Sequence, residues 1–426
     1  MTMDLRSSPL PRLLWVNVRL LHPLNGGDRL RTYHMLRQLR RHARITYFCP
    51  QTAQDDPSAC AQAAEYCDEL ITYPLKLKRS SSPAFYAAAL ANCIFGRLPF
   101  AAARYGNKQA TQRLQSLLNE HRHDLAVADY LMSWVHFASL PKAPAIPTVV
   151  FEHNIESLIW QRHASNLRLG PRRWVCHREW QLTRRLEDQV AHEAPGQIMV
   201  SAEEEAAFRN ERGMRNVLGW VPTGVDCDAF VPSSCAEPCL AFLGSMDWQA
   251  NVDAVLHFTR EVLPRIRAKV PQVKLLLIGR NPTPAIRQLA QNHPGIEVTG
   301  TVADVRPHLS RSSIMILPLR VGGGTRIKVF EAMAAGLPIV STSVGVEGLC
   351  TTDGEHVLIG DDSERFANQT LRLLQDASLR RSLAERARLW VKERFGWQQA
   401  ADHFFGLIKP LLPQGPEAPP PPGSLP

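Results

Sequence analysis

Long apolar runs are missing from this chain of 426 residues. A membrane-spanning helix needs about 20 consecutive apolar residues, and the longest candidate, at 86–95, has roughly half of that. The first residues of the chain include Asp4 and Arg6 in place of the apolar segment of a secretion signal. We therefore expect a soluble protein, or one that is attached to a membrane only peripherally.

Closely spaced cysteine pairs are missing as well. The nine cysteines are scattered along the chain, and none belongs to a Cys-x-x-Cys pair. Cys235 and Cys239 have no nearby pair of Cys or His residues, so a zinc site is not expected. An odd number of cysteines without regular spacing in a long chain indicates reduced thiols and a cytoplasmic location.

Acidic residues are too few to balance the basic ones, and the imbalance lies in the first half of the chain. The net charge is +9. Residues 1–215 contain 28 Lys and Arg against 20 Asp and Glu, and the remainder contains 21 against 20. A basic first half suits an anionic partner, namely a membrane surface, a phosphorylated acceptor or a nucleic acid. Ordinary solubilising charge explains the excess equally well.

Segments with the pattern of a strand alternate with helical segments through both halves. Strands are expected at 13–18, 45–49, 70–73, 125–129, 148–151 and 197–200, and then at 239–243, 273–278, 296–299, 314–317, 339–341 and 357–359. Helices are expected at 29–40, 84–94, 108–120, 172–192, 202–212, 251–269, 283–292, 325–335, 363–375 and 379–394. The alternation predicts an α/β protein with two doubly wound parallel domains that face each other across a cleft.

The length also favours two domains, because 426 residues are too many for one core. The first domain is predicted at 1–215 and the second at 239–396, with a linker rich in Pro and Gly at 216–238. A C-terminal helix at 397–412 could pack back on the first domain. The proline-rich residues 413–426 are expected to be disordered.

The most informative segment is 322–336. It follows the apolar run at 314–317, and its glycines Gly322, Gly323 and Gly324 let the backbone approach a ligand closely. Thr325 is a suitable N-cap for a helix that Gly336 would end. The start of a helix offers unpaired N–H groups to an anion, so a strand, a triglycine loop and a helix together form a candidate anion site.

Charged residues at the start of this helix narrow the range of ligands that the site could bind. Arg326 and Lys328 add positive charge, and Glu331 shares a helix face with Lys328. One ligand could meet a cation at its phosphates and a carboxylate at a part rich in hydroxyls, as a nucleotide diphosphate sugar would. The alternative is a tight glycine turn with a solvated ion pair. The Walker A motif and the dinucleotide fingerprint require other spacings.

Several segments together resemble the family 4 glycosyltransferases (glycosyl transferases group 1), which are retaining enzymes with the two-domain GT-B fold. An exopolysaccharide sugar transferase subgroup is among the possibilities. The resemblance covers roughly residues 12–400 and is most specific in the second half. The segments that carry it are 244–251, 276–279, 298–302 before Asp304, 322–338, 341–345 and 347–349.

The resemblance implies that the second domain binds the nucleotide sugar. Glu331 would accept hydrogen bonds from the ribose hydroxyls, and Arg326 and Lys328 would neutralise the diphosphate, which is also the leaving group. The other residues implied in donor binding are Gly244, Thr301, Val302, Gly322, Gly323, Gly324 and Thr325, with Thr301 and Val302 near the nucleobase.

In the first half, the segment 25–29 is a second glycine turn between a strand and a helix. Gly26, Gly27 and Arg29 are the acceptor-side candidates, although a plain strand-to-helix turn would have the same sequence. The family commonly places a histidine against the donor sugar after the fifth strand, which makes His153 a catalytic candidate. A lone histidine is more often structural, so both interpretations stay open.

The chain departs from the family pattern at two places. The family often has two glutamates eight positions apart, and Gly323 stands where the first would be. Donor-sugar contacts would then come from backbone amides. The basic residue frequent after the first strand of the second domain is also missing, because Ser245 and Met246 stand there. More of the phosphate binding would fall to Arg326 and Lys328.

Two other segments carry residues of the types that bind metals or anions. Asp226 and Asp228 have the Asp-x-Asp spacing of metal-dependent glycosyltransferases, but they lie in the predicted linker, so no metal is expected. Residues 160–190 interleave Trp160, Trp174 and Trp180 with arginines, which suits an anionic membrane interface or a pyrophosphate-linked acceptor. A long helix packed by its tryptophans is the equal alternative. No recognition motif supports nucleic-acid binding.

These observations predict a metal-independent retaining glycosyltransferase without a cofactor. It would move a sugar from a nucleotide diphosphate sugar to a glycan or lipid-linked acceptor, in bacterial exopolysaccharide or cell-envelope synthesis. We place it in the cytoplasm, with peripheral contact to the inner face of the plasma membrane as an option. The alternatives are a nucleotide-sugar epimerase or phosphorylase on a related fold and a nucleotide-sugar-binding subunit without catalysis.

Overall fold

The computed structural model describes residues 10–24, 26–78, 82–167, 169–232, 235, 237–321 and 327–413. The segment 322–326, Asn25 and the tail 414–426, for which the sequence makes predictions, lie outside the described residues.

The first half of the chain forms a sheet in which all paired strands run parallel, in the order β3-β2-β1-β4-β5-β6-β7. Its strands are β1 (Arg12–Val16), β2 (Arg44–Gln51), β3 (Glu69–Pro74), β4 (Leu125–Asp129), β5 (Thr148–Phe151), β6 (Gly196–Met199) and β7 (Val217–Trp220). The order reverses between β1 and β4. In doubly wound sheets, this reversal opens a crevice beyond the carboxyl ends of the strands.

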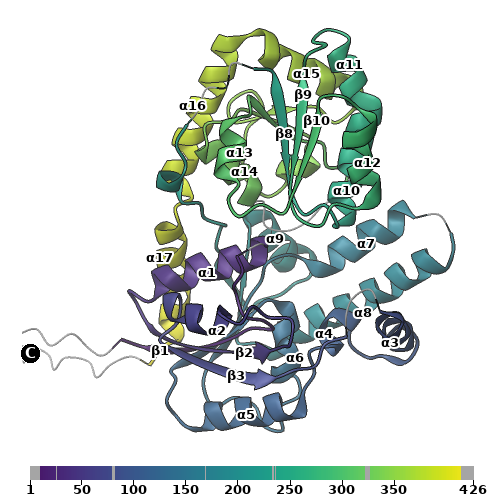
Figure 1. The fold of residues 1–426 in the computed structure, drawn as a ribbon. Helices are drawn as coiled ribbons and strands as arrows, with labels where there is room; N and C mark the ends of the chain where they lie inside the picture. The colour runs from purple at the N-terminus through teal and green to yellow at the C-terminus, as the bar shows by residue number, and fades with distance from the viewer. Residues whose placement is uncertain are drawn as a thin grey trace, which may run out of the picture.

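Helices cover both faces of this sheet (Figure 1). They are α1 (Gly27–Leu39), α2 (Ala59–Gln62), α3 (Pro83–Phe95), α4 (Phe100–Ala103), α5 (Lys108–Asn119), α6 (Trp134–Phe137), α7 (Glu156–Asn166), α8 (Pro171–Glu193) and α9 (Ala202–Ala206). Alternate residues of each strand enter different cores, since successive side chains of a strand point to opposite faces. Leu13 and Trp15 pack with α1, whereas Leu14 and Val16 pack with α5 and α8.

The second half forms a smaller parallel sheet in the order β10-β9-β8-β11-β12-β13. Its strands are β8 (Cys239–Leu243), β9 (Lys274–Ile278), β10 (Ile296–Gly300), β11 (Ile314–Leu317), β12 (Ile339–Ser341) and β13 (Leu358–Ile359). The order reverses between β8 and β11. In doubly wound sheets, such a reversal opens a crevice beyond the carboxyl ends of the two strands.

The helices of the second half are α10 (Gln249–His257), α11 (Leu263–Arg267), α12 (Pro284–Asn292), α13 (Arg306–Ser310), α14 (Ile327–Ala334), α15 (Ser363–Gln375) and α16 (Ala377–Arg394). A π-helical turn, Phe258–Val262, joins α10 to α11, so the single helix expected at 251–269 is interrupted. Pro264 lies just beyond this turn. Proline lacks an N–H donor, which is a physical reason for the change in hydrogen-bond pattern there.

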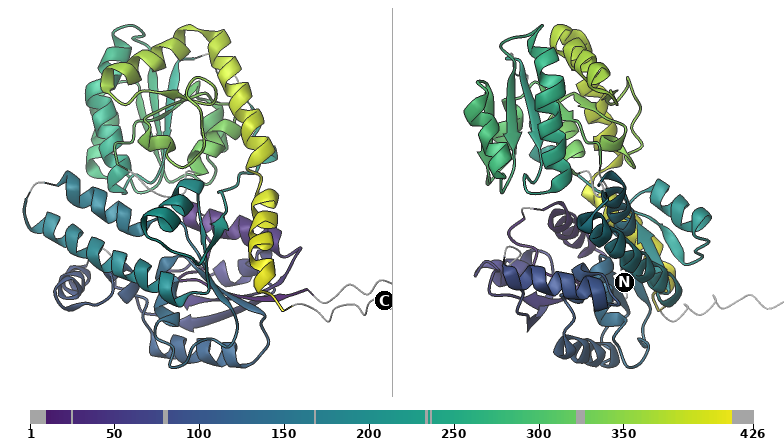
Figure 2. Two further views of the ribbon diagram at one scale, coloured as in Figure 1. Left: turned by 180° about the vertical axis from the view of Figure 1, so that it is seen from behind. Right: turned by 90° about the vertical axis from the view of Figure 1, so that its right-hand side faces the viewer.

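The chain passes between the two halves twice, and the two crossings run side by side (Figure 2). The Val225 N–H donates to the Phe395 carbonyl oxygen over 2.7 Å. After the second crossing, α17 (Trp397–Ile408) packs on the first half, where the Phe404 ring lies 5.5 Å from Trp15 and the Trp397 ring stacks on His34.

Strand β7 lies inside the segment 216–238 for which the sequence predicts a linker, so the prediction is wrong for residues 217–220. These residues pair with β6 as the edge strand of the first sheet. The run Val-Leu-Gly-Trp is short and contains a glycine, and only its pairing with β6 defines it as a strand. Within the described ranges, no helix is long and apolar enough to cross a membrane.

Candidate functional site

Glycines bring two loops of the second half together at the carboxyl end of its sheet. A Cβ on Gly279, after β9, would lie 1.8 Å from the Gly244 carbonyl oxygen, after β8. A Cβ on Gly244 would lie 2.7 Å from the Asn251 amide nitrogen. Larger residues at either place would separate the loops. Gly244, a predicted donor-binding residue, therefore lies in a tightly packed turn at the crevice.

Lys328 lies in the first turn of helix α14. Its side chain extends toward the tightly packed segment that contains Gly244 and Asn251. Its Nζ donates to Asn251 Oδ1 over 3.1 Å and lies 4.9 Å from the centroid of the Phe242 ring. Asn251 in turn donates to the Ser245 carbonyl oxygen. Lys328 is thus held at the crevice between β8 and β11. The predicted partners Gly322, Gly323, Gly324, Thr325 and Arg326 directly precede α14, outside the described residues.

Glu331 lies one turn further along α14 and faces the loop after β10. Burial, and next the carboxylate of Asp304, raise the pKa of Glu331 to about 7. Val302, from the same loop, packs against the core that includes residues of α14, whereas Thr301 is exposed. Val302 and Asp304, from the segment after β10, therefore both lie near α14.

Helix α14 ends as the sequence predicts. Gly336 has φ = 69°, a conformation that glycine adopts readily. The Leu337 N–H donates to the Ala332 carbonyl oxygen and the Gly336 N–H to that of Met333, the two bonds of a Schellman motif.

Arg280 is a cation at this site that the sequence interpretation missed. It follows Gly279 after β9, and its Nε donates to Ser245 Oγ over 2.8 Å. Ser245 stands where the family often has a basic residue, so Arg280 brings a guanidinium to that place from the neighbouring loop. Its position directly after a strand end was the available signal.

The acceptor-side candidates lie at the corresponding end of the first sheet. Gly27 begins α1, and a Cβ on Gly26 would lie 2.7 Å from an Asp28 carboxylate oxygen. Arg29 donates to the Pro23 carbonyl oxygen over 3.0 Å. Burial lowers the pKa of Arg29, and Arg19 and then Arg280 lower it further, against the opposing effect of Asp28. Arg29 therefore lies close enough to Arg280 of the second half for the two charges to repel each other.

His153 is almost fully buried two residues beyond β5 and is hydrogen-bonded to a carboxylate. Its Nε2 lies 2.8 Å from Asp129 Oδ1. The other oxygen of Asp129 accepts hydrogen bonds from Trp15, Asn17 and Thr32. Burial opposes ionisation of Asp129, but His153 and these donors lower its pKa below the usual value.

An ionised Asp129 can only accept hydrogen bonds, so His153 Nε2 carries the proton. His153 Nδ1 is buried and has no hydrogen-bond partner among the described residues. In the neutral ring, Nδ1 is a hydrogen-bond acceptor. The carboxylate of Asp28 also lies near His153: burial raises the Asp28 pKa, while Arg19 and, in its protonated form, the His153 ring lower it. The structure thus brings His153 and the turn at 26–29 together.

Two unusual residues flank this histidine. Tyr130, directly after Asp129, has φ = 77°, which is strained for a tyrosine, and its ring lies 5.7 Å from the His153 ring. Burial raises the pKa of Glu156 to about 7, and hydrogen bonds from Asn154 and Tyr130 partly oppose the shift. Like Asp129 and Arg280, neither had been recognised from the sequence.

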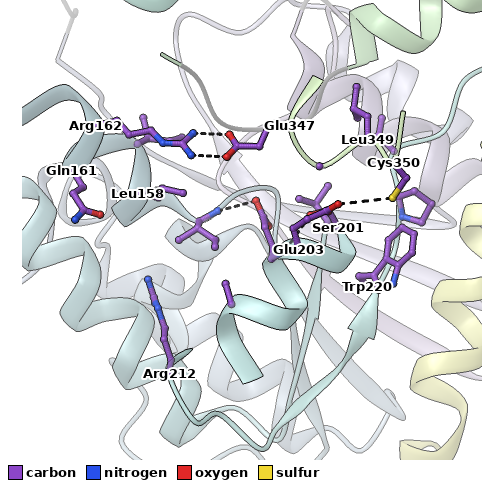
Figure 3. A pocket seen from close by; sticks show the side chains of 18 of the residues that line it. Leu158, Gln161, Arg162, Ser201, Glu203, Arg212, Trp220, Glu347, Leu349 and Cys350 are labelled. Carbon is purple, nitrogen blue, oxygen red and sulfur yellow. Dashed lines mark hydrogen bonds and ion pairs between the residues drawn. The ribbon is translucent and has the colours of Figure 1, made fainter. Parts of the chain in front are cut away.

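Both halves of the chain line a cavity of about 370 Å³ (Figure 3). Arg162 of α7 donates to both carboxylate oxygens of Glu347, each over 2.7 Å, and so joins the two halves. Cys350 Sγ lies 3.9 Å from a Glu203 oxygen on the other side of the cavity. Ile155, two residues after His153, also lines this space. The cavity is large enough for part of a small ligand between the halves.

The Asp-x-Asp pair has a local structural role. Asp226 Oδ1 accepts hydrogen bonds from the backbone N–H groups of Asp228 and Ala229, and so caps a short 3₁₀ turn. Asp228 is exposed and lies 3.9 Å from Lys392. Among the described residues, no three His, Cys, Asp or Glu side chains are grouped as a metal-ion site.

The segment 160–190 divides into two parts. The latter part of α8 packs into the first half through residues that include Leu182, Leu186 and Val190. Trp174 stands at the exposed beginning of the same helix, with 49% of its surface accessible. The packed-helix interpretation therefore describes the latter part of α8, whereas residues 171–174 at its start are exposed.

Comparisons with known structures define the fold. Sucrose-phosphate synthase from Thermosynechococcus elongatus superimposes with a TM-score of 0.69 at 17% identity, over 94% of this chain and 99% of that protein. Together with the two parallel sheets, this likeness shows the GT-B fold of glycosyltransferases, as the sequence predicts.

Residues 237–376 match the family model "Glycosyl transferases group 1". The predicted resemblance to this family is thereby confirmed for that segment, which contains Lys328 and Glu331.

Curated relatives are similar over part of their length. An "Uncharacterized 44.6 kDa protein in cps region" of Klebsiella pneumoniae is 22% identical over 38% of this chain and 44% of its own length. A GDP-mannose-dependent alpha-(1-6)-phosphatidylinositol monomannoside mannosyltransferase of Mycolicibacterium smegmatis is 23% identical over 62% of this chain and 79% of its own length. The chain spans about half the length of several curated relatives that it matches.

Proposed function

We propose that this chain is a glycosyltransferase that moves a sugar from a nucleotide diphosphate sugar to an acceptor, with retention of anomeric configuration. The observation that carries the proposal is the placement of Lys328 and Glu331 one turn apart at the start of α14, beside the loops after β8 and β10. This placement supports a cation at the diphosphate and a carboxylate at the ribose. The family match over the same residues supports the same assignment.

The reaction needs stabilisation of the negative charge that develops on the departing diphosphate. Lys328, with Arg326 before it and Arg280 across the crevice, would supply positive charge there. Backbone N–H groups at the helix start would add to it. With this many donors the diphosphate needs no metal ion, and we propose that neither a metal nor a cofactor takes part.

The first half would hold the acceptor and the donor sugar. In the mechanism proposed for retaining enzymes of this kind, the departing phosphate removes the proton of the acceptor hydroxyl on the same face of the sugar. The protein then mainly positions the reactants. His153 Nδ1, an acceptor in the neutral ring, would bind a hydroxyl of the donor sugar, while Gly26, Gly27 and Arg29 would border the acceptor.

We further propose a glycan or lipid-linked acceptor in exopolysaccharide or cell-envelope synthesis, at the cytoplasmic face of the membrane. The phosphatidylinositol mannoside named for the mycobacterial relative is such an acceptor, and the cps region named for the Klebsiella relative points the same way. The basic first half fits an anionic membrane surface. A nucleic-acid partner is not part of the proposal.

A thermal-shift screen of nucleotide sugars tests donor binding, because a ligand that binds the folded state raises the melting temperature. The nucleotide sugar that stabilises the protein is then incubated with it and candidate acceptors. Transfer of the sugar supports the proposal. Conversion of the donor to an epimer without an acceptor indicates the epimerase alternative, and binding without any conversion indicates an inactive binding subunit. A screen in which no nucleotide or nucleotide sugar stabilises the protein contradicts it.

A further inference from the structure

Helix α3 has an exposed face without a charged side chain. The helix contains no charged residue, and its exposed positions are Pro83, Ala84, Tyr86, Ala87, Leu90, Ala91, Ile94 and Phe95. Tyr86, Leu90 and Ile94 are spaced four residues apart and so form one stripe, with 63%, 53% and 50% of their surfaces accessible. Phe95, at the end of the helix, is 83% accessible. A surface helix ordinarily presents polar residues to water, so this face is the reverse of the usual pattern.

The opposite side of α3 fixes it to the first half. Cys93 is buried, and the Phe85 ring packs 5.2 Å from the ring of Phe100. Arg178 of α8 donates to the carbonyl oxygens of Cys93 and Gly96. Because this side of α3 makes the packing contacts, the apolar stripe on the other side of the helix faces solvent. Figures 1 and 2 show α3 beside α8 at the outside of the first half, away from the second half.

The start of α8 extends the apolar area. Trp174 precedes Arg178, which contacts α3, by one turn on the same side of α8, and it is 49% accessible. Leu169, in the turn before α8, is 87% accessible. We call Tyr86, Leu90, Ile94, Phe95 and Trp174 the α3 surface.

The charged residues of the two segments that contain this surface are all basic. Residues 70–119, which include α3, contain seven Lys and Arg and no Asp or Glu. Residues 157–178, which include the start of α8, contain five Arg and no Asp or Glu. Among the exposed members are Arg97, directly after α3, and Arg172 and Arg173, directly before Trp174. An apolar face bordered by cations fits the headgroup layer of an anionic bilayer.

We propose that the α3 surface docks this protein on an anionic lipid bilayer, with α3 lying in the plane of the interface. A second copy of the chain or a protein partner would also cover an apolar face, but neither explains the absence of acidic residues from segments 70–119 and 157–178. The inference deepens the proposed function, on which it rests for the reason to be at a membrane. Docking through the first half would present the cleft to a lipid-linked acceptor.

Vesicle flotation of the full chain tests the proposal without any need for activity. The chain is mixed with phosphatidylcholine vesicles, and separately with vesicles that also contain phosphatidylglycerol. We expect it to float with the anionic vesicles only, and less at high salt. The double substitution Leu90→Glu with Ile94→Glu should lower the partition constant by roughly tenfold or more for each side chain, because each would otherwise transfer an apolar group from water.

Leu389→Glu is the matched control, since Leu389 is 59% accessible on α16 of the second half. It should float as the unaltered chain does. Arg172→Glu with Arg173→Glu gives a second test that leaves α3 intact, and it should remove the preference for anionic vesicles.

The proposal is overturned if the unaltered chain fails to float with anionic vesicles. It is also overturned if the α3 variant and the Arg172/Arg173 variant float to the same extent as the Leu389 control. A concentration-dependent dimer that the α3 substitutions abolish, without vesicle binding, would identify a second copy as the occupant instead. Nucleotide-sugar binding by the same variants, measured by thermal shift, is expected to be unchanged. Its absence in every variant and in the unaltered chain would contradict the proposed function and leave the vesicle result standing.

Discussion

Lys328 and Arg280 of the second half donate hydrogen bonds to the neutral side chains of Asn251 and Ser245, whereas His153 of the first half is hydrogen-bonded to the buried carboxylate of Asp129. Against the effect of burial, and after the hydrogen bonds from Asn281 and Ser245, Arg280 also helps to lower the pKa of the nearby Asp247 carboxylate. The imidazole of the first half has one nitrogen fixed by the protein and the other, Nδ1, without a partner among the described residues. The second half is suited to bind a charged group, and the first half is suited to orient a neutral group.

The same contrast holds for the carboxylates. Asp129 is kept ionised by several donors, while burial shifts the pKa of Glu331 to about 7. A carboxylate with its donors already in place holds a fixed structure. One that gains its donors from a ligand has more to contribute to binding. We therefore expect substitutions in the second half to change affinity and those in the first half to change turnover.

Lys328→Ala should have the largest effect on affinity. Loss of a charge-assisted contact to phosphate costs about 1.5–3 kcal/mol, or roughly ten- to a hundredfold in the Kd of the nucleoside diphosphate. Calorimetric titration measures it. Lys274→Ala is the control, because Lys274 lies at the other end of the second sheet, paired with Glu237. Equal affinities for the Lys328 variant and the control would remove the basis for this donor site.

His153→Ala should lower kcat by about tenfold or more and leave the Kd of the nucleoside diphosphate nearly unchanged. The diphosphate is assigned to the second half, and His153 would act on the sugar as it reacts. Steady-state kinetics and titration of the same preparation separate the two quantities. A variant with full kcat would leave His153 as a structural residue.

Asp129→Asn sharpens this prediction without removing the ring. The oxygen that accepts from Trp15, Asn17 and Thr32 must remain an oxygen, so the new amide would turn its NH₂ toward His153. The proton would then move from Nε2 to Nδ1, and kcat should fall as in His153→Ala. Nitrogen chemical shifts of His153 report the tautomer. An unchanged tautomer with full activity would contradict the role of Asp129.

Arg280→Ala should weaken diphosphate binding by about tenfold, less than Lys328→Ala, because Arg280 lies at the edge of the crevice. Adding Ser245→Arg should restore most of the affinity, since it returns a guanidinium to the place that Arg280 occupies. Titration of the single and double variants gives the comparison. Failure of the second change to restore binding would mean that Arg280 acts through the conformation of its loop.

Glu331→Gln should weaken nucleoside binding only severalfold, because the amide retains one acceptor oxygen, and it should change the pH dependence of stability. An unfolded glutamate releases its proton near pH 4.5, whereas folded Glu331 releases it near 7. The unfolding free energy of the ligand-free protein should therefore fall as the pH rises through this interval. Urea unfolding at several pH values should show a smaller fall for the variant, and equal falls would contradict the assignment.

Chelation should have the smallest effect. Turnover is expected to persist in excess EDTA, because helix N–H groups and cations are assigned to the diphosphate. Loss of activity that magnesium or manganese restores would show that a metal takes part. Asp226 and Asp228 would then be the first residues to substitute.

Much of the fold could be predicted because it depends on local sequence. The apolar runs at Leu125–Asp129 and Ile314–Leu317 have the predicted bounds, and Gly336 ends α14 as expected. Strand β7 could not be predicted, because its four residues become a strand only by pairing with β6. Helix α7 (Glu156–Asn166) was not predicted either, because its apolar residues do not repeat with a clear helical period.

The sequence by itself determined the two parallel halves and the helix start that carries Lys328 and Glu331. It also showed the resemblance to the glycosyl transferases group 1, to which these two residues contribute. These depend on neighbours in the chain, on glycine spacing and on helical periodicity. Only the tertiary structure decided that Asp129 is hydrogen-bonded to His153 and that Arg280 donates to Ser245 of the neighbouring loop. Each of these pairs residues that are distant in sequence, so only the packing of strands and helices brings them into contact.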